Sequence, residues 1–139
     1  MRGGDATVTT ADWIVECMSN ADIGALAPRY AANVLLDVCA PKWRAQLQGR
    51  SAAAESLAED VARLPNVRTT WSRATVADDS VVVEYELRWD SPDGEALSRA
   101  VSIFRLDGAE IVEHRDYCCG VWSPADIEKN IAEAPIIHW

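Results

Sequence analysis

The feature that most constrains the fold is a run of four strand-like segments in the second half of the chain. Within residues 80–90, apolar side chains at every second position alternate with charged ones, which is the period of a half-buried β-strand. Turn-forming residues at 91–94 (Ser-Pro-Asp-Gly) and 107–108 (Asp-Gly) interrupt the pattern. It therefore predicts a meander of antiparallel strands over residues 67–77, 80–90, 95–106 and 109–119.

The first half of the chain has mainly helical patterns, defined by Ser and Thr N-caps, apolar stripes and Pro breaks. The expected elements are helices at 11–19, 23–27 and 51–64, a short β-like run at 34–38, a loop at 40–49 and a last short helix after Ser123. Helices followed by a strand meander predict an α+β fold. The length of 139 residues predicts one domain over 1–139, with its core at about 11–122 and a short helix and apolar tail at 123–139.

Charge and composition exclude several classes of function. The net charge of −9 and the pI of about 4.6 argue against a nucleic-acid or anionic-membrane surface, because both need clustered Lys and Arg. No segment is apolar for long enough to cross a membrane, and the polar residues 1–10 do not resemble a signal peptide. The four cysteines are irregularly spaced, as expected for free thiols. We therefore expect a cytoplasmic protein.

No metal or cofactor motif stands out in the sequence. The two histidines lie far apart, neither HxxxH nor HExxH occurs, and no glycine-rich phosphate loop is found. We therefore predict no metal site and no cofactor.

Three segments together resemble one known family. Residues 30–37 (YAANVLLD) are similar to the first strand entry of nuclear transport factor 2-like domains, residues 48–53 (QGRSAA) to the start of their third helix, and residues 103–117 (IFRLDGAEIVEHRDY) to their final hairpin. The resemblance implies a curved antiparallel sheet wrapped by the N-terminal helices into a cone with an internal pocket. Many members are dimers through the outer sheet face, which implies a homodimer.

Asp116 is the main candidate for catalysis. Alternation in the last strand puts it on one face with Val112, His114 and Cys118, and the resemblance implies that this face looks into the cone. In limonene-epoxide hydrolases and SnoaL-like cyclases, an acid at this position transfers protons. A carboxyl in an apolar pocket has a raised pKa and suits that work near neutral pH. The alternative is that Asp116 only accepts structural hydrogen bonds.

Two further residues are candidate helpers of Asp116. His114 lies two positions away and titrates in a useful range, although it is also explained as a packed side chain. Glu86 matches the position of a second acid in limonene-epoxide hydrolases. The Arg of those enzymes is replaced by Glu84 here, and only Arg88 or another nearby arginine would compensate. Epoxide hydrolysis is therefore in doubt, and a solvated charged strand face is the alternative for Glu86.

Other residues are candidates for lining the pocket. Ketosteroid isomerases carry their base one position after Asp37, where this chain has Val38, so that chemistry is not expected. The expected substrate-binding residues, chosen for aromatic, hydroxyl or small side chains near the cone, are Tyr30, Trp43, Ser102, Phe104, Cys118 and Trp122. Ordinary core or dimer packing is the alternative for most of the six tryptophans.

Two hypotheses about function follow from these residues and the resemblance. The first is a cofactor-independent acid/base enzyme acting on a small hydrophobic molecule of polyketide or terpenoid type, as a cyclase, isomerase, dehydratase or epoxide hydrolase. The second is a non-catalytic module of the same fold that binds a small ligand or dimerises. We favour the enzyme, and this preference depends more on the family than on the residues.

Overall fold

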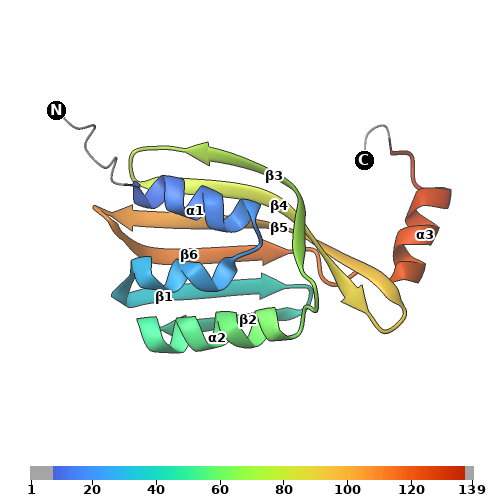
Figure 1. Cartoon of the computed structure of the whole chain (residues 1–139), viewed down its shortest axis with the longest axis horizontal. Coiled ribbons are helices and arrows are strands. Elements are labelled where there is room, and N and C mark those ends of the chain that lie inside the picture. The colour runs from blue at the N-terminus through green and yellow to red at the C-terminus, as the bar shows by residue number, and fades with distance from the viewer. Residues whose placement is uncertain (1–7, 137–139) are drawn as a thin grey trace.

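The predicted meander forms the larger part of a six-stranded sheet in the computed structural model, which describes residues 8–136 (Figure 1). The elements in chain order are α1 (Thr10–Ser19), the 3-10 helix η1 (Ile23–Arg29), β1 (Tyr30–Ala40), β2 (Trp43–Gln48), α2 (Arg50–Ala62), β3 (Arg68–Val76), β4 (Ser80–Ser91), β5 (Gly94–Asp107), β6 (Glu110–Cys118) and α3 (Pro124–Glu133). All four meander strands lie within one residue of their predicted bounds. The predicted fold class, α+β with a curved sheet, is confirmed.

The sheet is wider than the meander because β1 and β2 extend it. The strand order is β2-β1-β6-β5-β4-β3. Neighbouring strands are antiparallel except β1 and β6, which run parallel. The parallel pair arises because α2 carries the chain from the β1–β2 hairpin to the far edge of the sheet, and the meander then returns to β1.

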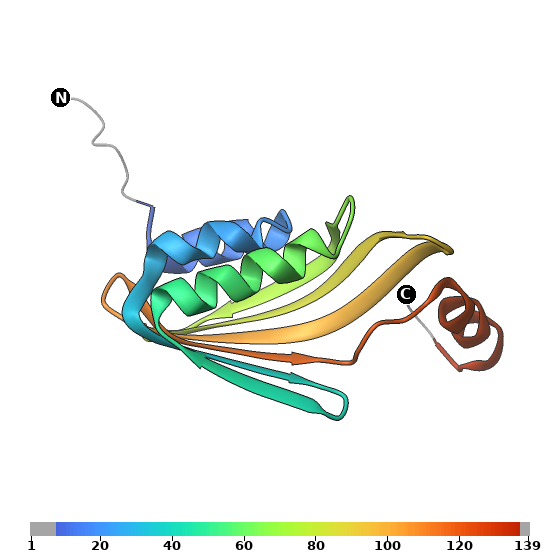
Figure 2. The ribbon, with the colours of Figure 1, turned by 90° about the horizontal axis from the view of Figure 1, so that it is seen from below.

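The sheet is curved and open, and α1, η1 and α2 all lie on one face of it (Figure 2). Large side chains such as Ile14, Met18 and Phe104 fill the space between these layers and are almost fully buried. Burying each of them contributes about 1.5–3 kcal/mol. The described helices leave the opposite face uncovered, and α3 stands beside the β4–β5 hairpin at one end. Among residues 8–136, no helix has both the length and the hydropathy that a membrane crossing requires.

The predicted loop at residues 40–49 is wrong, because it contains strand β2. Lys42 has a φ of 62° in the tight turn after β1, and residues 43–48 then pair with residues 35–40. This pairing satisfies backbone groups along β1. The short, largely polar sequence of β2 did not indicate a strand. Strand β1 is also longer than the predicted run at 34–38.

A β-bulge in β6 changes the predicted alternation. Leu106 pairs with Ile111 and Arg105 pairs with Glu113, so Val112 is the extra residue. An extra residue reverses the alternation on one side of the bulge. Ile111 is therefore buried in the core together with His114, whereas simple alternation put it on the opposite face.

The helix ends depend on local caps. Thr9 caps α1 by accepting a hydrogen bond from the Asp12 amide, and the Thr10 hydroxyl donates to the carbonyl of Ala109 (2.6 Å). At α3, the predicted Ser123 N-cap is confirmed, with a capping box that Asp126 completes.

Candidate functional site

A cavity of about 490 Å³ lies between α2 and the concave face of the sheet. Most of its wall is apolar and comes from α1, α2, β1 and β4. On β5 the lining side chains are small, namely Ser98, Ala100 and Ser102, which leaves the central space open. A volume of this size suits a small organic molecule.

Asp116 of β6 lines the cavity and is held by two hydroxyl groups. Its Oδ1 accepts hydrogen bonds from Tyr85 of β4 (2.9 Å) and from Ser102 of β5 (3.0 Å). Ser102 is in reach because it is the cross-strand partner of Asp116. The described residues make no hydrogen bond to Oδ2, and no buried side-chain polar atom among them lacks a partner. Oδ2 is therefore open to the cavity.

The surroundings of Asp116 make its charged form less favourable than in water. Burial raises the pKa of Asp116, the hydrogen bonds from Tyr85 and Ser102 oppose this shift, and Asp60 of α2, which also lines the cavity, adds to it. The ion pairs formed by the described residues do not include Asp116. The carboxyl thus has hydroxyl partners and no compensating cation.

His114 lies on the same face as Asp116 but does not touch it. The His114 ring stacks on Phe104 with 4.2 Å between ring centroids. Its Nδ1 lies 2.7 Å from the Tyr30 hydroxyl and its Nε2 lies 3.4 Å from Ser102 Oγ. Burial lowers the pKa of His114 to about 3, so the ring is neutral near pH 7. The two residues are connected through Ser102.

Glu86 lies on the opposite face of the sheet, so the prediction that it helps Asp116 in the pocket is wrong. Its carboxylate accepts hydrogen bonds from Thr70, Arg88 and Arg99 at 2.6–2.9 Å. Burial favours a higher pKa for Glu86, but these three donors outweigh it and lower the pKa. Because both arginines bind Glu86 on the outer face, neither supplies a positive charge beside Asp116.

The position expected for a steroid isomerase base carries no acid. Val38 lines the cavity, whereas the preceding Asp37 is on the outer face. There Asp37 accepts hydrogen bonds from Arg44 (2.7 and 3.0 Å) and Gln46 (3.0 Å). These bonds lower the pKa of Asp37 to about 2.

The six predicted substrate-binding residues separate into three groups. Ser102 and Cys118 line the cavity. Tyr30 and Phe104 are fully buried and contact His114 behind the cavity wall.

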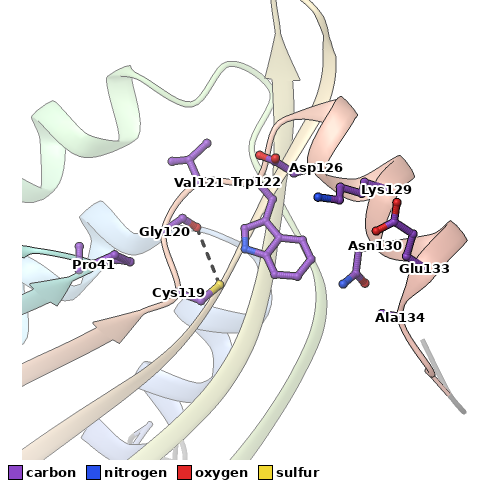
Figure 3. Close-up of a pocket in the computed structure, with 11 residues that line it drawn as sticks. Pro41, Cys119, Gly120, Val121, Trp122, Asp126, Lys129, Asn130, Glu133 and Ala134 are labelled. Atoms are coloured by element: carbon purple, nitrogen blue, oxygen red, sulfur yellow. Dashed lines mark hydrogen bonds between the residues drawn. The ribbon is translucent and has the colours of Figure 1, made fainter.

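Trp43 and Trp122 do not line this cavity, so the prediction for them is wrong. Trp43 lies on β2 with 69% of its surface exposed, because β2 is the edge strand. Trp122 exchanges backbone hydrogen bonds with Leu97 (2.8 and 3.1 Å) and lines a second, open cleft of about 920 Å³ beneath α3. Figure 3 shows this cleft, with the Trp122 ring opposite Lys129 and Asn130.

Tyr85 and Asp60 both influence Asp116 from the cavity wall, and neither is among the site residues predicted from the sequence. The alternation in β4 did put Tyr85 on the apolar face of its strand, but its bond to Asp116 spans two strands and depends on their register. Asp60 is a charged residue of the amphipathic helix predicted at 51–64, where charged side chains are expected on the solvent side. It lines the cavity near Arg63, with 4.0 Å between their charged atoms.

Within residues 8–136, no group of three or more His, Cys, Asp or Glu side chains has the arrangement of a metal site. The residues around Asp116 are hydroxyls, a neutral imidazole, the Asp60 carboxyl and apolar groups. Such a set can hold an organic molecule and exchange a proton with it.

The family follows from the sequence pattern of the SnoaL-like domain, which matches residues 11–114. The chain belongs to this family. No curated protein sequence matches it significantly.

Solved structures support the same fold. A nuclear transport factor 2-like protein of unknown function from Cytophaga hutchinsonii is similar, with 17% identity, a TM-score of 0.66, and 81% of this chain and 99% of that chain covered. A protein with a ketosteroid isomerase-like fold from Catenulispora acidiphila, in complex with trimethylamine, has 23% identity, a TM-score of 0.60, and covers 81% and 85%. A candidate polyketide cyclase from Xanthomonas campestris has 18% identity, a TM-score of 0.60, and covers 78% and 89%. At these identities the similarity establishes the fold of a SnoaL-like domain and no activity.

Proposed function

We propose that this SnoaL-like protein is a cofactor-independent acid/base enzyme in which Asp116 removes a proton from a small apolar molecule. One observation carries the proposal. Asp116 lines a largely apolar cavity, with Oδ1 held by Tyr85 and Ser102 and Oδ2 open to the cavity. A general base needs this combination of a fixed orientation and an accessible lone pair.

The raised pKa supports the same role. A carboxylate with a raised pKa is a stronger base while it remains ionised, and its protonated form persists closer to neutral pH, where it can serve as an acid. In the reaction, the C–H or O–H bond of the substrate breaks, its proton moves to Oδ2, and the electron pair stays on the substrate. Asp116 then gives the proton back at another position, as isomerisation, cyclisation and dehydration require.

The substrate class follows from the lining of the cavity. Asp60 and Asp116 are two acidic groups, and Arg63 is the one cation among the described lining residues. Arg63 lies close to Asp60 and is mostly exposed. Anionic ligands are therefore disfavoured, and we expect an uncharged molecule. Hydrolytic opening of an epoxide is less well supported, because Glu86, the residue matched to the second acid of epoxide hydrolases, is bound to Arg88 and Arg99 on the outer face.

A non-catalytic ligand-binding module is the second candidate, and one observation favours it. Oδ1 of Asp116 is already satisfied by two hydroxyls, so the carboxyl also has a role in holding the sheet together. In that case, ligands would bind without any proton being exchanged.

Deuterium exchange distinguishes these two functions without knowledge of the product. The protein is incubated in D₂O with a panel of uncharged ketones, epoxides and polyketide-like compounds, and loss of acidic C–H signals is followed by NMR. We expect exchange with the wild type and at least about a hundredfold loss with Asp116→Asn. The matched control is Glu84→Gln on the outer face, which keeps full exchange. Equal exchange with Asp116→Asn, or binding without exchange, would overturn the enzyme proposal.

We also propose that the protein is a homodimer through the outer sheet face. Trp71 and Tyr117 are exposed on this face, at 42% and 45%. Arginines on this face are paired with acids on the same face. The pairs are Arg44–Asp37, Arg73–Glu84, Arg88–Glu86, Arg99–Glu86, Arg105–Glu113 and Arg115–Glu113. This local charge balance would allow two copies of a chain with net charge −9 to meet there without repulsion.

Light scattering tests the dimer. We expect twice the chain mass for the wild type and the monomer mass for Ile103→Glu, which puts a charge on the outward side of β5. Ser98→Ala, on the inner side of the same strand, is the control and stays dimeric. A monomeric wild type would contradict this proposal.

A further inference from the structure

Tyr30 lies at the start of β1 and reaches the site from behind. It is fully buried, and its hydroxyl lies 2.7 Å from Nδ1 of His114, a residue 84 positions further along the chain. The cavity does not include Tyr30 among its lining residues, so this side chain cannot touch a ligand there. Its hydroxyl nevertheless begins a series of contacts that ends at Asp116.

The direction of the first hydrogen bond follows from the chemistry of the pair. Burial raises the pKa of Tyr30 above its usual range, so the phenol keeps its proton. Among the described residues, Nδ1 of His114 is the acceptor in contact with that hydroxyl. Tyr30 therefore donates to Nδ1. A neutral imidazole has one N–H, so the His114 proton is on Nε2.

The second and third bonds follow from the first. The Nε2–H group of His114 donates to Ser102 Oγ over 3.4 Å. Ser102 Oγ then acts as the acceptor for His114, which leaves its own proton for Oδ1 of Asp116 at 3.0 Å. In the other tautomer, Nε2 would accept the Ser102 proton, and Asp116 would lose one of its two hydroxyl donors.

We propose that Tyr30 is a positioning residue that fixes the tautomer of His114 and so directs the Ser102 hydroxyl to Asp116. This inference depends on the proposed function for its catalytic meaning, since it concerns the orientation of the base. It gives His114 the role of a neutral connector, in place of the acid/base partner expected from the sequence.

Several other groups around Asp116 also influence its titration. Asp60 and Arg63 face the cavity from α2, Tyr85 from β4, and Cys118 from β6; the described cavity residues of α1 and β1 carry no charge. Tyr85 donates directly to Asp116, and its hydroxyl also lies 3.1 Å from Ser102 Oγ. Tyr85→Phe therefore removes one donor to Asp116 and leaves the Tyr30–His114 bond in place, but it also changes the surroundings of Ser102.

The tautomer is tested first, by ¹⁵N NMR of the imidazole. The chain has two histidines, so His138→Gln is used to assign the His114 signals. We expect a protonated Nε2 and an unprotonated, hydrogen-bonded Nδ1 in the wild type at pH 7. A protonated Nδ1 would overturn the inference, and this result does not require any variant of Tyr30 to fold.

The coupling to Asp116 is tested by following its carboxyl carbon through a pH titration. Ser102→Ala and Tyr30→Phe are each expected to raise the Asp116 pKa by about one pH unit, because each removes one hydrogen bond to the carboxylate. The double variant is expected to match Ser102→Ala alone, since both act through one bond.

Two outcomes would contradict the proposal. The first is an unchanged Asp116 titration in folded Tyr30→Phe, which would make Tyr30 a packing residue. The second is additivity of Tyr30→Phe and Ser102→Ala. Failure of the proposed function would look different, because the wild type would then show no deuterium exchange although the titrations remained coupled.

Discussion

The two faces of one sheet hold a carboxylate in opposite ways, fully buried on the outer face and half-buried against the cavity on the inner one. On the outer face, Glu86 is 4% exposed and is paired with Arg88 and Arg99, which contribute to a lowered pKa. On the inner face, Asp116 has only hydroxyl partners, and burial raises its pKa. The direction of the pKa shift therefore follows the presence or absence of a neighbouring cation and not burial alone.

Under the proposed function, this difference separates a structural acid from a reactive one. A carboxylate paired with arginines remains ionised and its lone pairs are occupied, so it stabilises the fold and cannot exchange protons near neutral pH. A carboxylate held by hydroxyls keeps an orientation while its protonation stays adjustable. Variants placed on the inner and outer faces of the same strands therefore test the account.

After the loss of proton exchange in Asp116→Asn, the largest expected effect is the loss of ligand affinity when the cavity is filled. Ala100→Leu adds three carbons to the inner face of β5, and we expect at least a tenfold weaker affinity for any ligand found in the exchange screen. Val101→Leu adds one carbon on the outer face and should bind as the wild type does. Affinities are measured by isothermal titration calorimetry. If Ala100→Leu binds normally, the ligand site is elsewhere.

Removing the outer-face charge should affect stability and leave proton exchange intact. Glu86→Gln leaves Arg88 and Arg99 without their partner, and we expect a loss of about 1–3 kcal/mol in the free energy of unfolding. Glu84→Gln breaks one exposed pair with Arg73 and should cost less than about 1 kcal/mol. Urea unfolding measures both. Similar small losses in the two variants would show that a buried ion pair on this face contributes no more to the free energy of unfolding than an exposed one.

The smallest expected effect is in the pH dependence of the free energy of unfolding. The contributions of Asp37 on the outer face and Asp116 on the inner face should change in opposite directions with pH. The Asp37 pKa is about 2 in the folded protein and about 4 unfolded. Its contribution is therefore present above pH 4 and lost as the pH falls through 2. The raised pKa of Asp116 has the reverse consequence, with a contribution present below pH 4 and lost as the pH rises through the folded value.

Urea unfolding at a series of pH values tests these signs. Asp37→Asn should be less stable than the wild type at pH 7, with a difference that shrinks between pH 4 and pH 2. Asp116→Asn should be at least as stable as the wild type at pH 7, with a difference that shrinks toward pH 4. A large loss of stability in Asp116→Asn at pH 7 would instead assign Asp116 a structural role.

Much of the fold could be predicted because its signals are local. Alternation and turn residues located β3 to β6, and the Ser123 cap located α3. The same alternation put His114, Asp116 and Cys118 on one face, and all three line the cavity. These predictions need only the two-residue period of a strand and the residue preferences of turns and caps.

The remaining features depend on contacts between distant segments. The bulge at Val112 reverses which neighbours are buried, and no local pattern indicates it. The position of Glu86 was misjudged because the resemblance, not the period of β4, had put it in the pocket. Tyr30 and Tyr85 reach the site only through the register of strands that are far apart in sequence.

The measurement that tests the central claim most directly is the pH profile of deuterium exchange, compared with the carboxyl titration of Asp116. We predict that exchange rises with pH, that its midpoint coincides with the Asp116 pKa above the usual range, and that the rise is absent in Asp116→Asn. Exchange that persists in Asp116→Asn, or whose midpoint follows another group, would contradict the assignment of Asp116 as the base.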